Sequence, residues 1–122
     1  MKDLKEIKIL LAEDNKINAF VLKRFMVELE IAFDHAENGC IAVELCKNEY
    51  YDLILMNILM PVMDGFEATR LIRAFNTEVP IIAHTNYGGI RDKCLESGFN
   101  DYIRKPFSRD ELIKIIRKNI EL

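Results

Sequence analysis

Several residues that could bind phosphate or a metal ion each follow a short apolar run. They are the neighbouring acids Glu13 and Asp14, the amide Asn57, the hydroxyl Thr85 and the cation Lys105. Adjacent carboxylates suit a hard divalent cation such as Mg2+, which takes a few carboxylates and keeps several waters. A threonine hydroxyl can hydrogen-bond a phosphoryl oxygen, and lysine supplies a compact positive charge. Each residue alone has a commoner role, such as acids at a helix N-terminus, but together they indicate a phosphate site that uses a metal.

The apolar runs alternate with segments of helical period, which places these polar residues at strand ends. The predicted strands are residues 7–12, 31–36, 52–56, 79–84 and 102–103. The predicted helices are residues 16–29, residues 39–48, a helix that begins at Gly65 and carries Phe66, Thr69 and Ile72, residues 90–97 and residues 108–120. This (βα)5 order predicts an α/β fold in which helices cover both faces of a doubly wound parallel sheet. Sites in such folds lie at the carboxyl ends of strands, near the point where the strand order reverses.

Local signals support individual elements. Ser108 and Glu111 have the spacing of a capping box, and Gly98 is placed to end a helix in the left-handed conformation. The polar His84 lies in an apolar strand, which favours a buried neutral histidine with a backbone partner over a metal ligand or a phosphohistidine. The predicted apolar positions of the first helix are Phe20, Leu22, Phe25, Met26 and Leu29.

The composition predicts one domain, residues 1–122, with enough apolar residues for a sizeable core. A net charge of −3 gives no signature of nucleic-acid binding. No segment approaches the roughly 20 apolar residues of a membrane helix, and residues 1–5 lack the apolar core of a secretion signal. Cys40, Cys46 and Cys94 are an odd number without metal-binding spacing, as expected for reduced, buried thiols of a cytosolic protein.

The chain resembles the receiver domain of two-component response regulators over its whole length. The motifs that carry the resemblance are Leu11-Ala-Glu-Asp14-Asn15, Asp52-Leu-Ile-Leu-Met56, Met60-Pro-Val-Met-Asp-Gly65 and Asp101-Tyr-Ile-Arg-Lys-Pro106. The last three look most like receivers attached to hybrid histidine kinases. The resemblance implies a flavodoxin-like fold with strand order 2-1-3-4-5, and a cis peptide bond between Lys105 and Pro106.

The resemblance also implies roles for the polar residues. Asn57 stands where the family has the aspartate that takes phosphate from a phosphohistidine, and an amide has no nucleophilic oxygen of comparable strength. Asparagine also commonly caps a loop, but the completeness of the surrounding motif argues against this simpler role for Asn57. The implied magnesium ligands are Glu13, Asp14, Asn57 and the main-chain carbonyl of Leu59. Thr85 and Lys105 would bind phosphate, and Thr85 with Tyr102 would form the switch, although a partly buried strand tyrosine also fits Tyr102.

We therefore expect a phosphorelay receiver that is not itself an enzyme and is blocked at Asn57, with weakened Mg2+ binding. Its expected partners are a histidine kinase or a histidine phosphotransfer domain, met chiefly through the first helix, where Lys16, Asn18 and Lys23 are expected at the surface. An output domain or downstream protein is a further possible partner; nucleic acid and membrane are not expected.

Other functions remain open. The intact Glu13, Asp14, Thr85 and Lys105 favour an engineered inactive variant of a working receiver or a recent natural loss of the acceptor. Asn86, where the family usually has a small residue, and a short segment around Tyr87-Gly-Gly89 instead favour a natural atypical receiver that signals by contact without phosphorylation. A metal-dependent phosphohydrolase using Asp14 ranks low, because such enzymes usually place a second acid two residues on, where this chain has Lys16. A nucleotide- or flavin-binding protein lacks its glycine-rich loop after the first strand.

Overall fold

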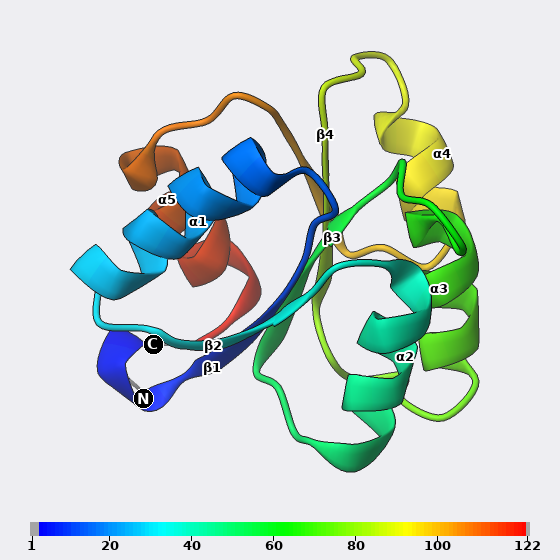
Figure 1. The fold of residues 1–122 in the computed structure, drawn as a ribbon, viewed down its shortest axis with the longest axis horizontal. Helices are drawn as coiled ribbons and strands as arrows, with labels where there is room; N and C mark the ends of the chain where they lie inside the picture. The colour runs from blue at the N-terminus through cyan, green and yellow to red at the C-terminus, as the bar shows by residue number, and fades with distance from the viewer. Residues whose placement is uncertain (1–2, 122) are drawn as a thin grey trace.

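The computed structural model describes residues 3–121 and shows a parallel sheet between two layers of helices (Figure 1). Met1, Lys2 and Leu122 of the predicted domain lie outside the described residues. The strands are β1 (Lys8–Ala12), β2 (Ala32–Ala36), β3 (Leu53–Asn57), β4 (Ile81–Thr85) and β5 (Asp101–Arg104). The helices are α1 (Lys16–Glu28), α2 (Gly39–Asn48), α3 (Gly65–Arg73), α4 (Arg91–Glu96) and α5 (Arg109–Asn119), after a short 3-10 turn, η1 (Leu4–Glu6). The strand order is β2-β1-β3-β4-β5 with every pair parallel, so the predicted flavodoxin-like (βα)5 fold is confirmed.

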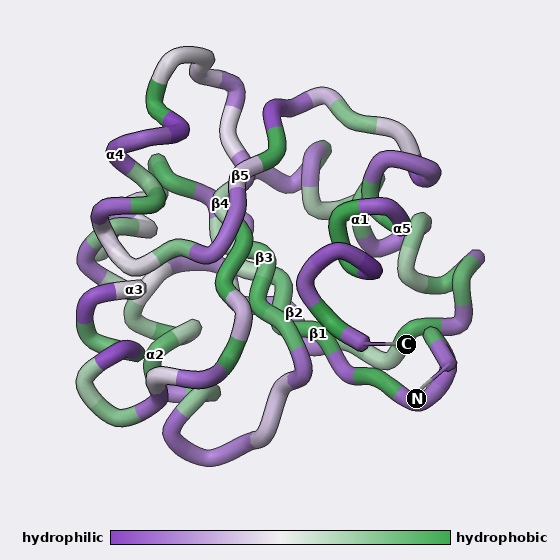
Figure 2. Tube along the Cα trace, turned by 180° about the vertical axis from the view of Figure 1, so that it is seen from behind, coloured by the Kyte–Doolittle hydropathy of each residue, from purple (hydrophilic) through white to green (hydrophobic). Residues whose placement is uncertain are grey.

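Each face of the sheet carries its own hydrophobic core. Leu10 and Ile54 belong to the core beside α2, α3 and α4, whereas Ile9 and Leu55 belong to the core beside α1 and α5. Figure 1 shows these two groups of helices on opposite faces of the sheet. Successive side chains of a strand point to opposite faces, so a strand that is covered on both sides must be apolar at every position. Figure 2 shows this as a green β3 at the centre, surrounded by helices on which green and purple residues alternate.

The first helix corrects one prediction. Leu22 and Met26 are buried as expected, together with Ala19, and Phe25 and Leu29 are half-buried. Phe20, by contrast, is 63% exposed. Successive helical residues are about 100° apart, so Phe20 is turned away from the face defined by Ala19, Leu22 and Met26. The amphipathic spacing was right for the helix and wrong for Phe20, which belongs to a second, solvent-facing apolar surface.

The turns that hold the site behave as the local signals predict. Ser108 and Glu111 form the capping box of α5, Gly98 has a φ of +101°, and the Lys105–Pro106 peptide is cis. Gly65 begins α3 with its N–H donating to the carbonyl of Ile58 at 2.7 Å. A Cβ at Gly65 would overlap the carbonyl oxygen of Asn57, so only glycine lets α3 begin this close to the end of β3.

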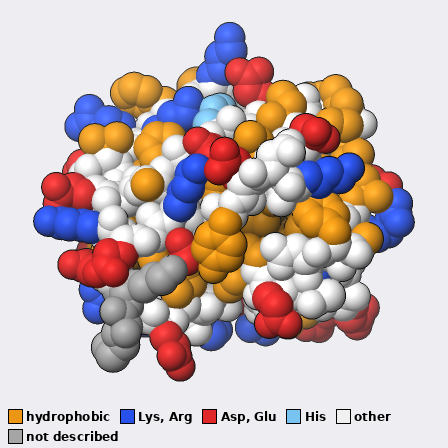
Figure 3. Space-filling view, turned by 90° about the horizontal axis from the view of Figure 1, so that it is seen from below, with side chains coloured by type: hydrophobic (Ala, Val, Ile, Leu, Met, Phe, Trp, Pro, Cys, Tyr) orange, Lys and Arg blue, Asp and Glu red, His pale blue; other side chains and the backbone are white. Residues whose placement is uncertain are grey.

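The surface shows mixed charges. On the face drawn in Figure 3, lysine and arginine side chains are interspersed with acidic ones, and this face offers no continuous basic area. Within residues 3–121, no helix has both the length and the apolar stretch that crossing a bilayer requires.

Candidate functional site

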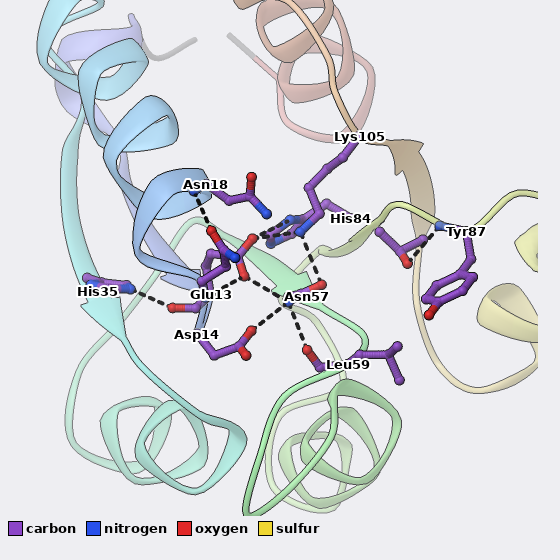
Figure 4. A network of polar contacts seen from close by, with 11 residues as sticks. Glu13, Asp14, Asn18, His35, Asn57, Leu59, His84, Tyr87 and Lys105 are labelled. Carbon is purple, nitrogen blue, oxygen red and sulfur yellow. Dashed lines mark hydrogen bonds and ion pairs between the residues drawn. The ribbon is translucent and has the colours of Figure 1, made fainter.

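The carboxyl ends of β1, β3 and β5 bring four of the predicted residues together (Figure 4). Asn57 is the last residue of β3, Glu13 and Asp14 follow β1, and Lys105 follows β5. The chain leaves β1 toward β2 on one side of the sheet and reaches β3 on the other, so this edge is the switch point of the strand order.

The amide of Asn57 is the centre of the cluster. Its Nδ2 donates to Glu13 Oε2 at 2.8 Å, to Asp14 Oδ1 at 2.9 Å and to the main-chain carbonyl of Leu59 at 3.0 Å. Its Oδ1 accepts from Lys105 Nζ at 3.3 Å. The reversed amide would set Oδ1 against three acceptors and the NH2 group against the Lys105 ammonium. The surrounding charges therefore dictate this orientation.

Glu13 and Lys105 form a buried ion pair beside this amide. Lys105 Nζ donates to Glu13 Oε1 at 2.6 Å, and the two side chains are 7% and 0% exposed. The second oxygen of Glu13 accepts from Asn57 and from the N–H of Asn15 at 3.2 Å. Both oxygens of a fully buried carboxylate thus have donors, which is the condition for burying such a charge without a large penalty.

His84 lies behind this ion pair in β4. It is completely buried, and its Nδ1 is 3.9 Å from Glu13 Oε1. Burial, with Lys105 as the next contribution, lowers the pKa of His84 from 6.5 to about 3. The histidine is therefore neutral near pH 7, as predicted. The backbone of Ala12 and Leu55 interacts with its ring and opposes part of the fall in pKa, although neither ring nitrogen makes a hydrogen bond of good geometry.

The lowered pKa predicts acid sensitivity. The unfolded chain takes up a proton at His84 below about pH 6.5, while the folded chain resists protonation until about pH 3, so stability falls as pH drops through this window. By pH 5 the loss should be about 2 kcal/mol. His84→Leu, of similar volume, should remove this part of the slope. Urea unfolding in EDTA from neutral pH to about pH 4.5 measures it, and equal slopes in the two chains would contradict the assignment.

The predicted switch residues meet at Tyr87 instead of at Asn57. Thr85 Oγ1 accepts from the N–H of Tyr87 at 3.2 Å, and the hydroxyl of Tyr102 donates to the carbonyl of Tyr87 at 2.6 Å. Figure 4 shows Tyr87 set apart from the Asn57 cluster. The sequence marked Tyr87 only as part of the short segment Tyr87-Gly-Gly89 and not as a partner of Thr85 and Tyr102. Gly89 has a φ of +75°, which permits a tight turn there.

Two adjacent clefts open over the site. One, of about 180 Å³, is lined by Asp14, Asn15, Asn18, Asn57, Leu59, Thr85, Asn86, Tyr87 and Lys105. The other, of about 270 Å³, is lined by Asn18, Val21, Leu22, Asn86, Lys105, Pro106 and Phe107. Thr85 shares the first cleft with Asn57, although no hydrogen bond joins them. Asn86 borders both clefts, so the unusual residue noted in the sequence lies at the approach to Asn57.

The oxygens around Asn57 fit a divalent cation in kind. Two carboxylates and a main-chain carbonyl are ligands that Mg2+ accepts. Their common neighbour, however, is the Nδ2 atom of Asn57, which lies within 3.0 Å of all three. Within residues 3–121, no group of three or more His, Cys, Asp or Glu side chains is arranged to hold a metal ion. At position 57 the cluster therefore presents a hydrogen-bond donor that points at these three oxygens.

Comparisons with known proteins agree with this geometry. The response regulator receiver domain family model matches residues 9–117. Hybrid signal transduction histidine kinase B of Dictyostelium discoideum is 41% identical over 93% of this chain, and transcription factor SKN7 of Candida albicans is 36% identical over 92%. The chain spans only 7% and 20% of the length of these two proteins.

Solved structures show the same fold. The receiver domain of a Pseudomonas aeruginosa sensor histidine kinase, with a magnesium ion coordinated in its active site cleft, is 41% identical with a TM-score of 0.86; 93% of this chain and 96% of that one are covered. The receiver domain in the Saccharomyces cerevisiae Ypd1–Ssk1 complex is 33% identical with a TM-score of 0.88, over 97% and 91% of the two chains. The sheet topology, the strand-end cluster and these matches together show that the chain belongs to the response regulator receiver domain family.

Proposed function

We propose that residues 1–122 form a receiver module of a two-component phosphorelay that binds a phosphohistidine donor but accepts no phosphate at Asn57. One observation carries the proposal: Asn57 ends β3 at the centre of Glu13, Asp14 and Lys105. In an intact receiver, a carboxylate oxygen there would attack phosphorus, the P–N bond of the phosphohistidine would break, and the imidazole would leave. The amide of Asn57 cannot take that part.

The other residues keep the roles expected of a receiver in this proposal. Thr85 and Lys105 would contact phosphoryl oxygens, and Tyr102 would follow Thr85. Glu13, Asp14 and the Leu59 carbonyl would bind Mg2+ weakly, because the cluster has a net charge of −1 where an aspartate at position 57 would make it −2. A cytoplasmic location and an output domain or downstream protein complete the proposal.

The donor would dock on α1. Ile17, Phe20 and Val21 are 76%, 63% and 42% exposed, which is unusual for three apolar residues within five positions. Val21 also lines the larger cleft, which adjoins the cleft over Asn57. The sequence predicted Lys16, Asn18 and Lys23 at this surface but not the three exposed apolar residues beside them. In the Ypd1–Ssk1 structure, a histidine phosphotransfer protein accompanies a receiver domain of the same fold.

The docking surface predicts a specific loss of binding. Ile17→Asp combined with Phe20→Asp should weaken binding to a histidine phosphotransfer protein at least about tenfold, because charges would replace apolar contacts at the centre of the interface. Ypd1 is a suitable probe, measured by calorimetry and by NMR shift mapping. Val27→Asp is the matched control, since Val27 is 65% exposed on the same helix but far from the site, and it should bind normally. Shifts that avoid residues 15–26 and the loop after Asn57 would count against docking on α1.

One observation favours a second candidate, a receiver that signals by contact without phosphorylation. Thr85 and Tyr102 are both tied to Tyr87, and the exposed Asn86 stands between the two clefts. In that case, Asn57→Asp would not change which partners the chain binds, even after treatment with a phosphodonor.

A further inference from the structure

Three oxygen atoms from separate positions of the chain converge on one nitrogen. Glu13 Oε2, Asp14 Oδ1 and the Leu59 carbonyl lie 2.8, 2.9 and 3.0 Å from Asn57 Nδ2. An amide NH2 group has two hydrogens, so it cannot give each of three acceptors a full hydrogen bond. Two carboxylates and a carbonyl around a single point are instead what a hard cation requires.

We propose that the Asn57 amide nitrogen occupies the position of the divalent cation in this site and holds the acidic pair together without metal. The inference rests on the proposed function in one respect, namely that Glu13, Asp14 and the Leu59 carbonyl are residues suited to Mg2+. The inference also goes further than the proposed function. There, Mg2+ binds weakly because the cluster has a lower negative charge, whereas here the amide also competes with the ion for the same position.

The distribution of charge explains why a donor is needed here. Glu13 is completely buried, and Lys105 bonds only one of its oxygens, Oε1. The other oxygen, Oε2, faces the cluster and shares the Asn57 NH2 group with Asp14. Without that group, Oε2 would keep only the N–H of Asn15, at 3.2 Å, and no donor would join the two carboxylates across this partly buried space, which is unfavourable.

The same contacts make the amide and a cation mutually exclusive. A cation bound by these three oxygens would need the space that Nδ2 fills, so the amide would have to turn away. Turning would break its bonds to Glu13, Asp14 and the Leu59 carbonyl, and would also remove Oδ1 from Lys105. Binding of Mg2+ to this chain must therefore overcome an existing set of hydrogen bonds as well as the lower charge.

Asn57→Ala separates competition from charge, because alanine and asparagine are equally neutral. If charge alone weakens the site, Asn57→Ala should bind Mg2+ no better than the Asn57 chain, since it also lacks the amide oxygen. If the amide competes, Asn57→Ala should bind Mg2+ at least about tenfold more tightly than the Asn57 chain, because no charge-assisted hydrogen bonds must be broken. Calorimetry and NMR titration with MgCl2 at constant ionic strength measure both affinities.

Thermal unfolding supplies a second readout. In EDTA, Asn57→Ala should have a lower Tm than the Asn57 chain, and MgCl2 should restore part of the difference because it raises the Tm of the Asn57 chain less. Asn100→Ala is the matched control: its Oδ1 accepts from Arg73 and from the N–H of Ile81, away from the acidic pair, so it should be destabilised without any response to MgCl2. In the Asn57 chain itself, the side-chain NH2 signals of Asn57 should shift only as Mg2+ binds, at concentrations at least about tenfold higher than Asn57→Ala requires.

The outcomes are distinct. Equal or weaker Mg2+ affinity in Asn57→Ala overturns the inference, because charge then governs the site. Asn57→Asp is the positive control; if it too fails to respond to MgCl2, the metal role given to these residues under the proposed function fails, and the inference fails with it. Loss of donor binding alone would refute the docking proposal and leave this result untouched, since the titration contains only the chain and the ion.

Discussion

Asn57→Asp should convert a chain that takes up no phosphate into one that takes up close to one phosphate per molecule from a small phosphodonor with Mg2+. The substitution exchanges an NH2 group for an oxygen of nearly the same size, at the centre of Glu13, Asp14 and Lys105. It supplies the missing nucleophile and removes the donor that points at the acidic pair. Intact-mass measurement and sensitivity of the bound phosphate to hydroxylamine, which cleaves acyl phosphates, test this result.

The unaltered chain is the matched control, because it differs only in that one group. Acyl phosphate on the unaltered chain at Asp14 or Glu13 would show that Asn57 is not the disabled centre. A failed rescue would direct attention to Asn86, which lines both clefts over the site. Asn57→Asp combined with Asn86→Ala would then test whether this side chain blocks the phosphodonor.

The same substitution should cost stability when no metal is present. In EDTA near neutral pH, we expect Asn57→Asp to unfold with a free energy lower by about 2 kcal/mol. The aspartate loses the hydrogen bonds that Asn57 donates to Glu13 and Asp14, and it adds a third negative charge beside them. Lys105 already pairs with Glu13 at 2.6 Å, so it offsets only part of the repulsion.

Urea unfolding measures this difference, and two conditions should reduce it. Saturating Mg2+ should narrow the gap, since an ion present at about 100 times its dissociation constant stabilises the folded form by about 2.7 kcal/mol. Mild acid should also narrow it as the added carboxyl takes up a proton. An aspartate chain that equals or exceeds the Asn57 chain in stability in EDTA would rule out the repulsion.

The sequence by itself determined the scaffold of this protein. Runs that are apolar at every position, such as 52–56, require cover on both faces, and their alternation with helical segments leaves few arrangements other than the observed sheet. Because the carboxyl ends of parallel strands lie at one edge of the sheet, the polar residues at the ends of β1, β3 and β5 had to meet there. Local chemistry likewise sufficed for the Ser108 capping box and the left-handed Gly98, since each depends on a few neighbouring residues.

Only the tertiary structure decided where individual side chains point. The spacing of α1 could not tell that Ala19 faces the sheet while Phe20 is exposed, because the choice depends on how the helix is rotated against its neighbours. Thr85 and Tyr102 both hydrogen-bond to the main chain of Tyr87, a residue that the sequence marked only as part of a short segment and not as their partner. The direction of the Asn57 amide depends on charges 43, 44 and 48 residues away along the chain. Such contacts arise from packing between residues that are far apart in the chain, and sequence periodicity carries no information about them.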